Sequence, residues 1–176
     1  MTGRRTAEST EQQHGMNRSP HSVVREAVTV QAPVETAFRV FTEQCDAWWP
    51  RSYRLGLAER VGIVLEPRVG GRWYQRTTDG NECDWGSVLA WEPPARVTLS
   101  WQIGIGFVPE PDPARASRVD VTFIVVGAER ATVSVSHSEL ERHGDGWQAM
   151  AEGVAGERGW GGILRAYAQV VAVRAG

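Results

Sequence analysis

Lysine is missing from this sequence of 176 residues, and all 19 basic residues are arginines. Because 21 acidic residues oppose them, the net charge is −2. A protein that holds a nucleic-acid backbone needs a surplus of positive charge on its surface. We therefore expect no nucleic-acid partner.

Cysteine and long apolar runs are also scarce. The two cysteines, Cys45 and Cys83, are too few for a disulfide scaffold and lack the paired spacing of a zinc site. Both are predicted to be free thiols of a cytoplasmic protein. No apolar run approaches the length of a membrane span, so no transmembrane segment is expected.

Residues 1–20 are polar and poor in β-branched and aromatic residues. Such a segment does not bury enough apolar surface to offset the entropy lost on ordering. It is predicted to be a disordered tail, and residues 21–176 are predicted to form a single domain.

Two hydrophobic periods alternate along the rest of the chain. A period of two predicts a strand over 22–30, and Pro33 followed by an apolar stripe at the 3.6 period predicts a short helix, with a second one at 45–50. Trp147 to Val154 predict a further short helix, and Trp160 to Val171 a longer one that runs to the C-terminus. Six more strands are expected at 61–67, 72–78, 83–91, 96–103, 118–126 and 131–140.

This order of elements favours an α+β helix-grip. In that fold a curved seven-stranded antiparallel sheet surrounds a long C-terminal helix, and two short helices follow the first strand. The Pro/Gly-rich connection at 104–117 is too long for a tight hairpin and is interpreted as mobile, with a lid as the alternative.

The alternation also predicts which side chains face the helix. An odd-numbered loop keeps four residues of strand 118–126 on the same face as three of strand 131–140: Val119, Val121, Phe123 and Val125 with Val133, Val135 and His137. Strand 83–91 leaves two choices. One places Trp85, Leu89 and Trp91 inward; the other places Gly86, Val88 and Ala90 there.

Several motifs resemble those of a known superfamily. They are VQAPVETAFRVF at 30–41, WWP at 48–50, GGRWYQRTTDG at 70–80, WGSVLAWEPPARVTLSW at 85–101, and SHSEL with a downstream GW. Over residues 22–173 the sequence is similar to the SRPBCC superfamily, which has the START-like or birch-pollen-allergen-like fold. Within it, the resemblance is to bacterial homologues of the activator of heat-shock-protein-90 ATPase.

This resemblance implies a cavity between sheet and helix that accepts apolar molecules, and it implies no named catalytic residue. The expected partner is a small hydrophobic or aromatic molecule, bound to a monomer or homodimer. A chaperone partner is less expected, because residues 1–20 are unsuited to form the additional chaperone-binding domain of the eukaryotic activator. The residues predicted to bind the ligand are Trp85, Leu89, Trp101, Phe123, Val135, His137, Trp160, Ile163, Leu164 and Tyr167.

His137 is the candidate for acid–base chemistry, because a titratable ring among valines on a cavity-facing strand can orient a ligand or move a proton. The alternative is a hydrogen-bonded core histidine. Glu26 intrudes on the apolar face of strand 22–30 and is expected at its rim in water, with a pairing to His137 or an arginine as the alternative. Cys45 is expected to be a buried structural thiol. The glycine pairs Gly70-Gly71 and Gly161-Gly162 lack the spacing of phosphate-binding loops, so no cofactor is predicted. The four histidines are scattered along the sequence, so no metal is predicted.

Three functions remain open at this point. The favoured one is a soluble binding protein whose cavity holds an apolar or aromatic small molecule. The second is a cyclase or hydrolase that uses the same cavity, with His137 as general acid or base. The third is an interaction protein that binds a partner through exposed tryptophans and the 104–117 connection.

Overall fold

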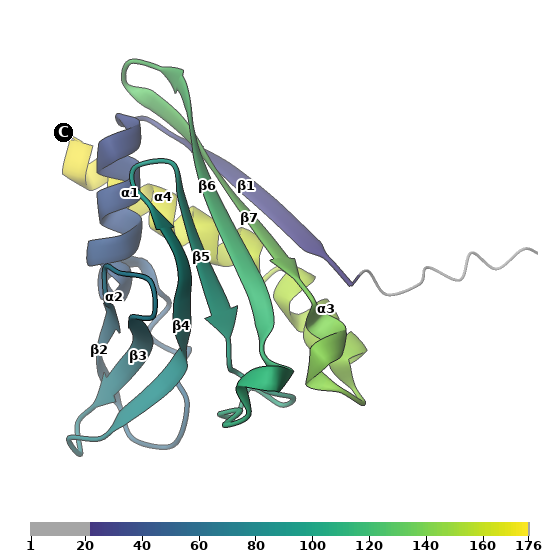
Figure 1. Ribbon diagram of the computed structural model, residues 1–176. Coiled ribbons are helices and arrows are strands. Elements are labelled where there is room, and N and C mark those ends of the chain that lie inside the picture. The colour runs from purple at the N-terminus through teal and green to yellow at the C-terminus, as the bar shows by residue number, and fades with distance from the viewer. Residues whose placement is uncertain (1–21, 176) are drawn as a thin grey trace, which may run out of the picture.

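The computed structural model describes residues 22–175 (Figure 1). The tail predicted at 1–20 lies outside these residues, and the division into tail and domain stays a prediction.

The elements follow the predicted order with small changes at their ends. Strand β1 (Val24–Val30) leads into helices α1 (Val34–Glu43) and α2 (Cys45–Trp48). Six strands come next: β2 (Arg60–Leu65), β3 (Arg72–Thr77), β4 (Glu82–Glu92), β5 (Arg96–Trp101), β6 (Ser117–Gly127) and β7 (Arg130–Ser138). The described chain also contains two 3-10 turns, η1 (Pro113–Arg115) and η2 (Leu140–His143), and helices α3 (Trp147–Ala155) and α4 (Trp160–Ala175).

The strands form one antiparallel sheet in the order β1-β7-β6-β5-β4-β3-β2. The sheet is strongly curved, and α4 runs across it (Figure 1). The expected helix-grip fold is confirmed. No helix within residues 22–175 combines the length and the apolar character needed to cross a bilayer.

The register between β6 and β7 is the predicted one. Val119 pairs with His137, Val121 with Val135, and Phe123 with Val133. A bulge between Val125 and Gly127 supplies the extra residue that the odd-numbered connection requires. All three pairs are buried on the face that α1 and α4 cover, whereas Val125, which pairs with Ala131, is 61% exposed.

Strand β4 follows neither predicted alternative as a whole. Trp85 and Val88 are both buried, although residues three apart point to opposite faces of a regular strand. A register shift between Val88 and Ala90 takes Leu89 out of the ladder, and its side chain is 45% exposed. The prediction that Leu89 faces the cavity is therefore wrong.

Helix α4 buries the apolar stripe that its sequence predicts. Trp160, Ile163, Leu164, Tyr167 and Val171 are all buried. The Tyr167 hydroxyl also donates a hydrogen bond of 2.7 Å to the carbonyl of Ala37, which ties α4 to α1. These contacts fix the position of the α4 N-terminus, where the candidate site lies.

Candidate functional site: a tryptophan-lined cavity

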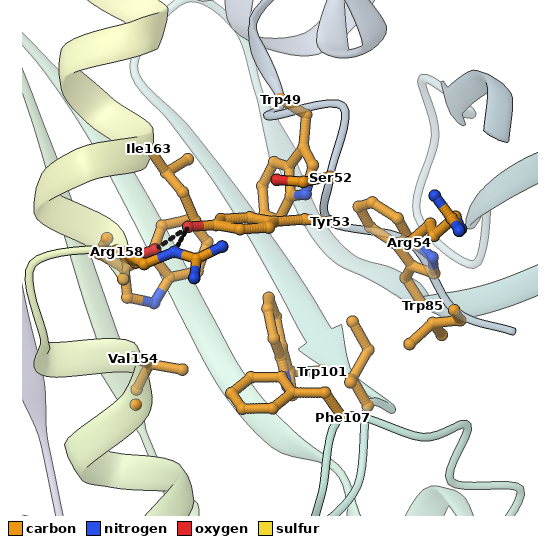
Figure 2. Close-up of a pocket in the computed structure, with 15 residues that line it drawn as sticks. Trp49, Ser52, Tyr53, Arg54, Trp85, Trp101, Phe107, Val154, Arg158 and Ile163 are labelled. Carbon is orange, nitrogen blue, oxygen red and sulfur yellow. Dashed lines mark hydrogen bonds between the residues drawn. The ribbon is translucent and has the colours of Figure 1, made fainter. Parts of the chain in front are cut away.

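A cavity of about 430 Å³ lies among the end of β5, the segment 49–55 that follows α2, and the junction between α3 and α4 (Figure 2). This volume falls within the range of pockets that hold small organic ligands. Four tryptophans line it: Trp49 from the segment after α2, Trp85 from β4, Trp101 from β5 and Trp160 from α4.

Trp49 is at the centre of this group. Its ring centroid lies 5.1 Å from that of Trp85, 5.8 Å from that of Trp160 and 6.4 Å from that of Trp101. Trp73 packs behind them, 5.4 Å from Trp85. Aromatic rings at these spacings and tilted angles stabilise one another beyond the burial of their area. The cavity wall is thus an ordered aromatic surface.

The polar edges of two of these rings point away from the cavity. Trp85 Nε1 donates to Gln75 Oε1 at 3.2 Å, and Trp160 Nε1 donates to His137 Nδ1 at 3.1 Å. The two indoles therefore offer carbon surface to a ligand. Such a wall favours a flat apolar molecule over one that needs many hydrogen bonds.

Two buried polar side chains hold the 49–55 segment in place. Arg60 donates to the carbonyls of Trp49, Pro50 and Tyr53 at 2.7 to 3.2 Å, and its Nε lies 3.3 Å from a carboxylate oxygen of Asp46. Gln75 forms two hydrogen bonds with the backbone of Leu55, at 2.7 and 2.9 Å. One wall of the cavity is therefore fixed by side chains of β2 and β3.

A turn in the 104–117 connection forms another wall. Gly104 and Val108 share a 2.7 Å backbone hydrogen bond, and Phe107 has a φ of 57°, a left-handed conformation. The Phe107 ring reaches the cavity and packs on α3, where a Cβ added to Gly153 would lie only 3.1 Å from it. The sequence interpretation of this connection as a mobile loop overlooked the phenylalanine that it places at the cavity.

The polar groups of the cavity gather at its mouth. The Tyr53 hydroxyl donates to the carbonyl of Arg158 at 2.8 Å and accepts a bond from Arg158 Nε at 3.3 Å (Figure 2). Ser52 and Arg54, the chain neighbours of Tyr53, also line the cavity. Arg54 and Arg158 are the charged residues among those that line the described cavity, and both are exposed.

His137 belongs to a buried chain of hydrogen bonds behind Trp160. Its Nε2 lies 2.7 Å from Ser117 Oγ, which lies 2.8 Å from His143 Nε2. Because an indole N–H only donates, His137 Nδ1 must accept, which assigns the ring proton to Nε2. The Ser117 hydroxyl then donates to His143. Both nitrogens of His137 are occupied by protein groups.

Burial lowers the pKa of His137 to about 3, and the neighbouring His143 contributes in the same direction. Burial also lowers the pKa of His143. A neutral, fully buried ring with both nitrogens bonded fits a core histidine better than a general acid or base.

The comparisons with known proteins are consistent with this geometry. A family model described as activator of Hsp90 ATPase homolog 1-like protein matches residues 31–172. The chain belongs to this family. The sequence of this chain matches no curated protein.

Solved structures of similar fold include proteins of different activities. The anthrahydroquino-γ-pyrone synthase Txn09 is 40% identical, with 84% of this chain and 96% of that chain covered and a TM-score of 0.61. CalC, a self-sacrificing resistance protein from Micromonospora echinospora, is 28% identical, with 86% and 95% covered and a TM-score of 0.63. The Aha1 dimer from Colwellia psychrerythraea, at 13% identity, 88% and 98% coverage and a TM-score of 0.56, shares the fold alone.

The structure places the predicted ligand-binding residues in three groups. Trp85, Trp101, Trp160 and Ile163 line the cavity. Leu89 is exposed and does not line the cavity. The third group is buried in the core without lining the cavity: Phe123, Val135, His137, Leu164 and Tyr167.

Sequence reasoning missed the cavity residues that come from loops. Trp49 entered only as part of the WWP motif, and the other such residues were not singled out: Ser52, Tyr53, Arg54, Phe107 and Arg158. Loop residues carry no periodicity, so burial patterns do not reveal them. The available signal was composition, since RSYR directly after WWP combines aromatic and donor side chains in a short connection.

Two other candidate residues also lie outside the cavity. Cys45 is buried, and burial raises the pKa of its thiol to about 12, which suits an unreactive structural thiol. Glu26 is partly buried on β1, and its carboxylate lies under Gly161 of α4. Residues 22–175 contain no group of three or more His, Cys, Asp or Glu side chains arranged to hold a metal ion.

The His137 chain predicts a pH dependence of stability. Between pH 6.5 and 3 the unfolded protein binds a proton at this ring that the folded protein excludes, so stability falls as the pH falls. One such histidine contributes up to about 1.4 kcal/mol per pH unit. In His137→Phe, unfolding in urea between pH 6 and 4 should show a shallower loss of stability. If stability falls equally steeply with pH in both proteins, the pKa of His137 is not lowered by folding.

Proposed function

We propose that this protein binds a planar polycyclic aromatic molecule in the tryptophan cavity. The observation that carries the proposal is the meeting of four indoles around one cavity of about 430 Å³, two of which have their N–H groups taken by protein side chains. Flat rings stack on such a surface with little loss of conformational freedom. The 40% identity to a synthase of anthrahydroquino-γ-pyrones supports a fused-ring aromatic ligand of polyketide type.

A fluorescence titration with 1-hydroxyanthraquinone tests this proposal. Emission from the tryptophans should be quenched saturably, because a stacked ring contacts several of them. Val154→Phe places a larger side chain in the cavity from α3, where Val154 is 4% exposed, and should weaken binding at least tenfold. Val173→Phe, at an α4 position that is 79% exposed, is the matched control and should leave binding unchanged. Absence of saturable quenching in the wild-type protein, or equal weakening in both variants, would overturn the proposal.

Ring closure on the bound aromatic is the second candidate function, favoured by the same 40% identity. A γ-pyrone forms when a phenol oxygen adds to the β-carbon of an adjacent alkynyl ketone, and the phenol proton moves to the α-carbon, so mass is unchanged. The cavity would promote this step by holding the side chain folded against the ring. An o-hydroxyanthraquinone with an alkynyl ketone side chain should then isomerise faster with wild-type protein than with Val154→Phe.

A further inference from the structure

The charge and hydrogen-bond character of the cavity mouth point to a more specific ligand. We infer that the aromatic ligand carries an anionic oxygen, a carboxylate or acidic phenolate, at the edge that faces Arg54 and Arg158. This inference rests on the proposed function, because it names the chemistry of the molecule that the tryptophans hold.

The first support is the sign of the charge. Of the residues that line the described cavity, two are ionised and both are arginines, whereas none is Asp or Glu. Nine of the sixteen arginines of the described chain lie within 4.0 Å of a carboxylate, and Arg54 and Arg158 are among the seven that do not. Within residues 22–175, neither of these two positive charges at the mouth has an ion-pair partner.

The second support is the arrangement of the donors. Arg158 is oriented by its own contacts: its Nε bonds the Tyr53 hydroxyl at 3.3 Å, and its guanidinium carbon lies 5.5 Å from the Tyr53 ring centroid. The bond from Nε leaves the two Nη groups of Arg158 to a ligand. Arg54 and Arg158 stand on opposite sides of the mouth, one on the segment held by Arg60 and the other at the α3–α4 junction (Figure 2).

The contrast between wall and mouth completes the argument. Trp85 and Trp160 offer carbon surface, since their N–H groups are taken by Gln75 and His137. A flat ring can stack there while one of its edges reaches the arginines, which bind anionic oxygens through charge-assisted hydrogen bonds. A wholly neutral ring would leave those donors to water.

A matched pair of probes tests the inference: anthraquinone-2-carboxylate and its neutral carboxamide, titrated at pH 7 by tryptophan quenching. The carboxylate should bind about tenfold tighter, and added salt should weaken its binding more than that of the amide. The double variant Arg54→Gln/Arg158→Gln should lose the preference and keep its affinity for the amide. Because both side chains are exposed, and Tyr53 bonds the backbone carbonyl of residue 158, the fold should persist.

Arg130→Gln is the control, an exposed arginine on the β6–β7 hairpin at the far end of the sheet from α3 (Figure 1). It should retain the preference for the carboxylate. Equal binding of both probes to the wild-type protein would overturn the inference while leaving the proposed function intact, as would a preference that survives in the double variant. If neither probe binds, the proposed function fails and this inference fails with it.

Discussion

Replacing Arg60 with methionine is expected to lower the free energy of unfolding by about 3 to 5 kcal/mol. The guanidinium is fully buried, with hydrogen bonds to three carbonyls and an ion pair with Asp46. Methionine fills much of the same space but donates nothing, so the three carbonyls and the carboxylate would lose their partner. Denaturant unfolding followed by circular dichroism measures the loss.

Arg68→Met is the matched control for this substitution. Arg68 forms an ion pair of 2.9 Å with Glu66, but its side chain is 66% exposed. Pairs of this kind contribute about 0 to 1 kcal/mol, because water and salt screen them. A loss in Arg60→Met no larger than that of the control would contradict the role given to Arg60. If Arg60→Met is destabilised as expected, it should also bind the ligand more weakly, because the 49–55 wall of the cavity would no longer be held.

The second large effect is expected in α4. Leu164→Ala should reduce stability by about 2 to 5 kcal/mol, because this side chain is 1% exposed and its removal leaves a cavity under the helix. Val173→Ala removes a smaller group from an exposed position of the same helix and should change stability by less than about 0.5 kcal/mol. Thermal and urea unfolding of both variants give the comparison. Similar small losses would show that α4 is not docked on the sheet.

The fold could be predicted because its core follows regular periods. Val119, Val121 and Phe123 alternate with polar residues along β6, and the stripe of α4 repeats at helical spacing. Local deviations from the period could not be predicted. Leu89 was misplaced because the register shift at Trp85, between its neighbours Asp84 and Gly86, reverses the faces of β4 before Val88. Near it, Gly86 lies so close to the backbone of Ser100 that a Cβ would overlap it, a tertiary contact that leaves no local pattern.

The candidate site was predicted less completely than the fold. The residues on regular elements were found from their periods: strand alternation gives Trp101 and one of the two choices for Trp85, and helical spacing gives Trp160. His137 was placed on the correct face, but its distance from the cavity depends on Trp160, which comes between them from another element. Arg60 and Gln75 gave no sequence signal either, since a buried polar residue can be recognised only once its partners are known.

For the 49–55 segment, the residues that support the backbone differ from those that can contact a ligand. Its backbone path is set by Arg60 and Gln75, which belong to the core, whereas the side chains of Ser52 and Arg54 are exposed at the mouth. Substitutions at these two positions can alter ligand choice without disturbing the support beneath them. Relatives that keep the arginine and glutamine can therefore diverge in specificity through very few mutations, and directed evolution of this cavity can begin from positions 52 and 54.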